Sequence, residues 1–316
     1  MSRKSSNIGG QAVIEGIMMR AGDQYAIAVR KPDQTIEVKT EAYRELPGAK
    51  RLAKVPVIRG MFAFVDSLVI GIRCLMYSAS FYDDEEETEG QDKAAPRELT
   101  EEEKRKKEKE DSLLMTGTLI LSAVMAVGIF MLLPYLAASF LEKFVASRTL
   151  LAFLESLIRV GIFLAYMLLI SRMKDIQRTF MYHGAEHKCI NCIETGKPLT
   201  VENVLTCSRE HKRCGTSFLF FVMIVSAVFL MFIQTDDRVL RLVLRLLLIP
   251  VIAGVSYEII RLAGRSEHPL VNLLSKPGLC LQRLTTREPD AAQTEVAIAA
   301  VEAVFDWKKW QEEELS

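Results

Sequence analysis

The sequence predicts an α-helical polytopic membrane protein with about four transmembrane helices and a small cytosolic α+β part. Half of its 316 residues are hydrophobic, and they gather in long apolar stretches rather than spreading along the chain. A helix needs roughly 20 predominantly apolar residues to cross a hydrocarbon core about 30 Å thick. Four stretches reach that length and are expected to span a membrane: Leu113–Leu141, Leu150–Ile170, Cys214–Gln234 and Val239–Ala263.

The distribution of basic residues predicts how these spans are oriented. The long loop Arg172–Arg213 holds eight Lys and Arg residues, whereas the short loops Ser139–Thr149 and Thr235–Arg238 hold three together. Loops on the cytoplasmic side of a membrane carry an excess of Lys and Arg. The first ten residues are polar and lack the apolar region of a signal peptide. We therefore expect a multi-pass protein in the lipid bilayer of the cell membrane, with the long loop and both termini in the cytosol.

Residues 1–80 are expected to form a cytosolic β-meander followed by an interfacial amphipathic helix. Tyr25–Lys31 and Thr35–Thr40 alternate apolar and polar side chains, as half-buried strands do. Gln11–Arg20 is expected to be one further strand, covered on both faces, with Glu15 in its middle. Met61–Tyr77 has apolar residues at helical spacing and only two charges, which favours a helix at the membrane surface. The alternative for this helix is a fifth span, which would place the N-terminus outside.

The rest of the chain divides into three parts. Residues 81–111 are rich in charge and poor in apolar side chains, so we expect a charged, disordered linker there. Residues 112–265 hold the four spans and the cytosolic loop 171–213. Residues 266–316 form a cytosolic helical tail, whose last helix is expected over Ala291–Trp310 behind the capping pair Asp290 and Gln293. The formal net charge is zero and glutamate is interleaved with the Lys104–Lys109 cluster, so no nucleic acid is expected as a partner.

A metal-binding motif lies in the long loop. His183-Gly184-Ala185-Glu186-His187 spells H-x-x-E-H, the inverted zinc-protease pattern. Residues four apart on a helix lie one above the other, so both imidazoles can reach one zinc ion. Glu186 would flank that ion without binding it, which is the position of a general base for hydrolysis.

His211 and Cys214 complete the predicted zinc site. They lie three residues apart where the third span begins, close to the cytosolic end of the second span. We therefore expect His183, His187, His211 and Cys214 to bind one ion. Cys189 and Cys192 also have a metal-like spacing, but on a continuous helix they point away from the histidines. The alternative is that the histidines are partly buried, hydrogen-bonded and free of any ion.

Several segments resemble the bacterial YqhQ-like membrane family over nearly the whole chain. The matching motifs are Gly9–Gly16 with Met18–Arg20, Tyr182–Lys188, Arg213–Phe218, Tyr257-Glu258 with Arg261, and Pro277–Leu279 with Leu284–Thr286. The chain departs from the family's usual pattern at Ile193 and Lys212, and neither position is a candidate ligand. The resemblance implies a metal-dependent enzyme of the bacterial cell membrane, and it implies no substrate.

The leading functional interpretation is a zinc-dependent membrane hydrolase that acts at the cytosolic membrane boundary on a peptide or lipid-linked substrate. The alternative is a membrane scaffold, or a protein-assembly or translocation factor, with a structural metal and other membrane proteins as partners. A catalytic zinc keeps an open position beside three protein ligands, whereas a structural zinc is closed by four. Charges inside the spans, such as Glu155 with Arg159 and Glu258 with Arg261, leave transport as a third interpretation. The sequence leaves the oligomeric state open.

Overall fold

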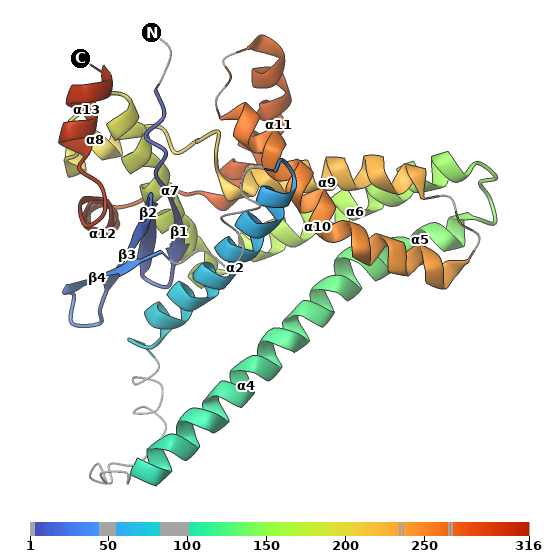
Figure 1. Ribbon diagram of the computed structural model, residues 1–316, viewed down its shortest axis with the longest axis horizontal. Coiled ribbons are helices and arrows are strands. Elements are labelled where there is room, and N and C mark those ends of the chain that lie inside the picture. The colour runs from blue at the N-terminus through green and yellow to red at the C-terminus, as the bar shows by residue number, and fades with distance from the viewer. Residues whose placement is uncertain are drawn as a thin grey trace. The chain divides into compact units, whose positions relative to one another are not determined.

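The computed structural model describes residues 4–43, 55–82, 101–233, 235, 237–264, 266 and 268–315. The chain divides into two compact units. One combines Met1–Asp83 with Met167–Ser316, and the other is Asp84–Tyr166. The first unit contains the N-terminal sheet, the metal motif and the C-terminal helices, and it is shown with the rest of the chain in Figure 1.

The predicted β-meander is confirmed as a four-stranded antiparallel sheet. Its strands lie in chain order and are β1 (Gly9–Val13), β2 (Gly16–Ala21), β3 (Gln24–Arg30) and β4 (Ile36–Ala42). The single strand expected over Gln11–Arg20 is instead a hairpin, because Val13 pairs with Gly16 across a turn at Ile14 and Glu15. Glu15 has a φ of 49°, a left-handed conformation that is uncommon for a residue with a side chain. Its carboxylate forms an ion pair with Arg178 and accepts a hydrogen bond from the Tyr182 hydroxyl, and these contacts hold the turn.

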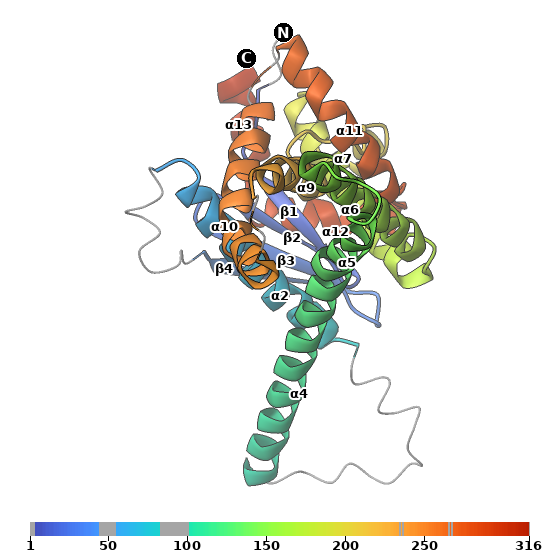
Figure 2. The ribbon, with the colours of Figure 1, turned by 90° about the vertical axis from the view of Figure 1, so that its right-hand side faces the viewer.

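The two faces of the sheet pack against different helices, because successive side chains of a strand point to opposite sides. Ile17, Met19 and Ala28 share a buried core with α7 (Lys174–Glu194) and α12 (Ala291–Glu302). Residues Met18, Ile27 and Val29 form a second core with Ile70 and Cys74 of α2 (Ile58–Ala79). In Figure 1, α2 runs beside the sheet, and Figure 2 shows α12 close to the strands.

Five helices of the described chain are long and apolar enough to cross a membrane. The sequence-based number of four was therefore too low by this criterion. The additional helix is α2, which contains the predicted interfacial helix Met61–Tyr77. The others are α4 (Glu101–Val127) with the π-helical turn η1 (Gly128–Leu132) and α5 (Leu133–Leu141), then α6 (Arg148–Ile170), α9 (Gly215–Phe232) and α10 (Arg238–Ala263).

The expected linker 81–111 falls mostly outside the described residues, which leave out 83–100. Its last part is helical, because α4 begins at Glu101. The predicted charge pair of Glu155 and Arg159 forms at 3.0 Å within α6. Glu258 binds the guanidinium of Arg59, and its Oε1 lies 2.6 Å from the Arg59 Nε. This ion pair joins α10 to α2 where Gly60 and Gly254 bring the two backbones together.

The C-terminal part adds α11 (Pro269–Thr285), α12 and α13 (Trp307–Leu315), and a short helix α8 (Val201–Leu205) follows α7. The predicted cap of the last helix is confirmed. The Asp290 carboxylate accepts from the Gln293 backbone N–H at 2.7 Å, and the Gln293 side chain accepts from Asp290 N–H at 3.1 Å. The single helix expected over Ala291–Trp310 is two helices, because α12 ends at Glu302 and α13 starts at Trp307.

Candidate metal centre

Helix α7 supplies the two histidines of the motif from one face. His183 and His187 lie one turn apart, with ring centroids separated by 4.5 Å. Gly184 between them allows another segment to approach the helix closely, since a Cβ at this position would lie 2.0 Å from the carbonyl oxygen of Arg287. The Arg287 N–H donates to the carbonyl oxygen of Phe180 at 2.9 Å, so the chain after α11 is bonded to α7 beside the motif. The glycine is thus required by packing.

Both imidazoles are oriented by backbone carbonyl groups. The Nδ1 of His183 lies 2.8 Å from the Thr285 carbonyl oxygen, and the Nδ1 of His187 lies 2.6 Å from the Arg209 carbonyl oxygen. A carbonyl oxygen only accepts hydrogen bonds, so each Nδ1 carries the proton and donates it. The Nε2 of each ring is then the nitrogen that can bind a metal ion. Histidines that bind metal commonly donate their other ring N–H to a carbonyl in this way.

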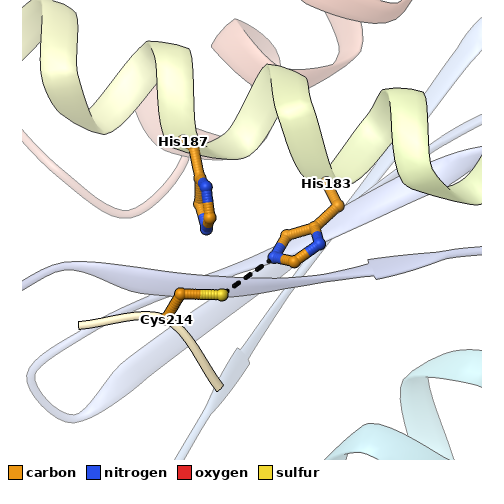
Figure 3. Close-up of side chains that lie close together, drawn as sticks. All are labelled: His183, His187 and Cys214. Atoms are coloured by element: carbon orange, nitrogen blue, oxygen red, sulfur yellow. Dashed lines mark hydrogen bonds between the residues drawn. The ribbon is translucent and has the colours of Figure 1, made fainter. Parts of the chain in front are cut away.

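Cys214 brings the third ligand atom from the start of α9 (Figure 3). Its Sγ lies 3.2 Å from the Nε2 of His183 and accepts from the Thr216 backbone N–H at 3.4 Å. Cys214 is the N-cap of α9, so its sulfur lies against the first backbone amide groups of that helix. One ligand atom from each of His183, His187 and Cys214 lies within 4.8 Å of the others, so the described residues can hold one metal ion here.

His211, the fourth predicted ligand, is not part of this group. Its Nε2 lies 3.8 Å from the Glu194 Oε2, and its backbone N–H donates to the Gln282 Oε1 at 2.9 Å. The prediction rested on the three-residue spacing of His211 and Cys214, which brings two side chains together only on a helix. The segment before Gly215 is not helical, however, so the three-residue spacing does not bring both side chains to one point.

Glu194 ties this non-helical segment to the N-terminus. Its Oε1 accepts from the Ser6 N–H at 2.9 Å and from the Arg213 guanidinium at 2.7 Å. Burial opposes ionisation of Glu194, but the hydrogen bond and charge of His211, with Arg213 and Ser6, outweigh it and lower its pKa to about 2. Burial lowers the pKa of His211 to about 4, so His211 is uncharged at neutral pH. Arg213 and Ser6 are therefore the donors that stabilise the carboxylate at neutral pH.

Glu186 is buried between α7 and the first strand. Its Oε1 accepts a hydrogen bond from the Gly10 N–H at 3.0 Å, whereas Oε2 has no hydrogen-bond partner among the described residues. Burial raises the pKa of the Glu186 carboxyl, against the opposing effects of His183 and the Gly10 N–H. Gly10 has no room for a side chain, because a Cβ there would lie 2.5 Å from the Met18 carbonyl oxygen and 3.1 Å from the Glu186 Cδ.

The metal-binding group opens into a cavity of about 680 Å³. His183, Glu186 and Cys214 line it together with Gly10 and Arg213. The remaining wall comes from β1, α2, α7, α9 and α10. The sequence analysis named three residues of this group and Glu186 as site candidates, but it did not predict Gly10 or the contribution of α2. The paired glycines at the start of a strand were the available signal for Gly10, since glycine in a strand often marks a close approach of another group.

Cys189 and Cys192 lie in the core between α7, the sheet and α12, on the side of α7 away from the cavity. Burial and the neighbouring Cys207 thiol raise the pKa of Cys192 to about 12. Burial also raises the pKa of Cys189. Both side chains are therefore protonated thiols, which are poor metal ligands.

Together, the apolar helices and the His₂Cys group define a multi-pass, membrane-associated protein with a candidate metal centre. The family model described as "Protein of unknown function (DUF1385)" matches residues 55–307. The chain is also similar to "Uncharacterized protein YqhQ" of Bacillus subtilis (strain 168), with 36% identity over 294 residues that cover 92% of this chain and 89% of that protein. The chain belongs to this family of uncharacterised YqhQ-like proteins. No solved structure matches it significantly.

Proposed function

We propose that this protein is a zinc-dependent membrane hydrolase that uses Glu186 as its general base. The observation that carries the proposal is the convergence of His183, His187, Cys214 and Glu186. The histidine Nε2 atoms and the cysteine Sγ form one potential ligand set, and Glu186 lines the same cavity as His183 and Cys214. A peptide or lipid-linked substrate at the cytosolic membrane boundary would have access to this cavity.

The donor set fits zinc in its catalytic form. Two imidazoles and one thiolate are ligands that zinc prefers, and three protein ligands leave its fourth position open. A closed structural site needs a fourth protein ligand, and His211, the candidate for it, instead faces Glu194. A structural role also gives no reason to bury the carboxylate of Glu186 with one oxygen unpaired. The presence of three candidate ligands without a fourth, together with the buried carboxylate of Glu186, therefore favours the hydrolase over the scaffold.

Zinc bound there would polarise the substrate and lower the pKa of a water molecule to about 7. Glu186 can accept the proton that this water loses. The Gly10 N–H holds its Oε1, so Oε2 is the oxygen that is free to take the proton. Burial raises the pKa of the carboxyl, which brings a general base closer to the pH at which it works. His183 and His187 keep their orientation throughout because Thr285 and Arg209 hold their Nδ1 atoms.

The described termini support an even number of membrane crossings. Lys4 Nζ lies 3.2 Å from Glu314 Oε2, and the sheet shares a core with α7 and α12. A chain that returns to the same side crosses an even number of times, so α2, α4–α5 and α6 cannot all cross between the sheet and α7. Because α2 packs on the sheet through Ile70 and Cys74, we assign it to the membrane surface on the cytosolic side. The basic loop then places both termini in the cytosol.

The hydrolase proposal is tested by Glu186→Gln in the full-length protein, expressed in a strain lacking its own copy. The amide keeps the shape of the side chain but cannot accept a proton, so function in complementation should be lost. Zinc content and membrane abundance should stay at wild-type levels. The matched control is Glu202→Gln on α8, where the glutamate is exposed and does not line the cavity.

His187→Ala is the companion variant, and it should reduce bound zinc well below one equivalent. A scaffold held by a structural metal predicts a different pattern, with Glu186→Gln nearly silent and His187→Ala depleted from the membrane. Full complementation by Glu186→Gln would end the hydrolase proposal. If wild-type protein purified without chelators contains no transition metal, the proposed zinc site is also ruled out.

A further inference from the structure

The cavity beside the ligand group combines polar side chains with apolar walls. His183, Glu186 and Arg213 line it beside Cys214, and further polar side chains also line it: Gln11, Ser67, Thr179, Thr216 and Tyr257. The walls include Phe64 and Leu68 of α2, Phe218 and Leu219 of α9 and Ile260 of α10. The rings of Phe64 and Phe218 pack at a centroid distance of 5.7 Å, so α2 and α9 meet at this wall. A ligand that fills the cavity must therefore have both polar and apolar parts.

The apolar walls open toward the surroundings of the helices. Leu68 is 53% exposed, Leu75 is 43% exposed and Leu219 is 42% exposed, although all three line the cavity. They lie on α2 and α9, two of the helices that are apolar enough for a membrane. A helix at the membrane surface, as assigned to α2, buries its apolar face at the boundary with the acyl chains, and the exposed leucine of α9 faces hydrocarbon. The leucines of the cavity wall thus border the lipid phase.

The size of the cavity favours a single hydrocarbon chain as its occupant over a peptide helix. A helix with its side chains is about 10–12 Å across, so a volume of 680 Å³ would hold only about 6–9 Å of it, or roughly five residues. Cavities of about 300–1,000 Å³ instead enclose small molecules. An unbranched hydrocarbon chain needs no internal hydrogen bonds and can lie along the leucine wall, whereas an extended peptide would leave backbone N–H and C=O groups unpaired among these residues.

We propose that the ligand of this cavity is a membrane lipid, with one hydrocarbon chain along α2 and α9 and its headgroup toward Arg213. This inference rests on the proposed function for the identity of the lipid as a substrate, but the binding itself does not require zinc or Glu186. The proposal assigns α2 a role in selecting the hydrocarbon chain of the lipid. The bond that joins the hydrocarbon chain to the headgroup then lies beside His183 and Cys214.

Photolabelling tests the binding directly. Membrane vesicles containing the full-length protein are loaded with a phospholipid whose palmitoyl chain carries a terminal diazirine, then irradiated, and labelled peptides are mapped. We expect label on α2 and α9. Leu68→Trp places a larger ring in the wall and should reduce labelling at least fivefold. Val69→Trp is the matched control, because Val69 is 43% exposed on the same helix but does not line the cavity.

A second pair of variants tests the same wall from α9, in case Leu68→Trp loses labelling only because it misfolds. Leu219→Trp lines the cavity from α9, and its control is Ile224→Trp, at a position of similar exposure on the same helix outside the cavity. Equal labelling of wall variants and controls would mean ordinary lipid contact and would overturn the proposal. Competition by an apolar peptide but not by palmitoyl lysophospholipid would also overturn it. Undiminished labelling of Glu186→Gln is expected even if that variant proves fully functional, so the hydrolase can fail while the lipid site stands.

Discussion

Gly184→Ala tests whether the chain after α11 determines the geometry of His183. A Cβ at Gly184 would lie 2.0 Å from the Arg287 carbonyl oxygen, and an ordinary contact begins at 3.4 Å. The difference, 3.4 minus 2.0, requires the backbone to retreat by about 1.4 Å. The obstacle is a backbone carbonyl, which cannot move aside as a flexible side chain could. The substitution must therefore shift the whole segment.

Two measurable consequences, in stability and in metal affinity, should follow from that shift. Alanine gains about 0.8–1 kcal/mol of helix propensity over glycine. Overpacking costs about 1–3 kcal/mol, and loss of the hydrogen bond from Arg287 N–H to Phe180 adds about 1 kcal/mol, so the net effect should be destabilisation by about 1–3 kcal/mol. Thr285, two residues before Arg287, accepts from the His183 Nδ1. Displacing such a partner typically weakens metal affinity about 10–100-fold.

Both effects can be measured on purified full-length protein in nanodiscs. Thermal unfolding followed by tryptophan fluorescence reports stability, and competition with a zinc chelator reports affinity. The control is Gly161→Ala in α6, where nothing lies within 4 Å of the new Cβ, so this change should be neutral or slightly stabilising. A Gly184→Ala protein as stable as the Gly161→Ala protein, with unchanged zinc affinity, would refute the packing argument.

Two further predictions concern topology and pH. Single cysteines introduced at Ser5 and Glu314 should both be protected from an impermeant thiol reagent added outside the cell, whereas one at Ser147 should react; reaction at only one of the two termini would favour a fifth span. The lowered pKa of Glu194 stabilises the fold fully above the unfolded-state value of about 4.3, and this contribution is lost as the pH falls toward about 2. Unfolding temperatures should therefore fall over that range in the wild type and less in Glu194→Gln, and parallel curves for the two proteins would contradict this assignment.

Patterns within short segments of the sequence determined much of the local structure of this protein. Apolar stretches of about 20 residues identified the helices of the membrane region, because hydrocarbon accepts little else. The i,i+4 spacing placed His183 and His187 together, since helical geometry alone decides which side chains stack. The capping box at Asp290 and Gln293 was recognisable for the same reason, as every contact in it lies within four residues.

Contacts between distant segments were decided only by the tertiary structure. Gly10 donates to Glu186 across 176 residues, and no local pattern indicates that β1 lies against α7. The hairpin at Glu15 lacks a glycine or asparagine turn, and it is held instead by Arg178 from α7. His211 has a ligand's spacing from Cys214 but faces Glu194, because the chain between them is not helical. Local spacing determines geometry inside a helix, whereas the position of one segment against another depends on the packing of the whole core.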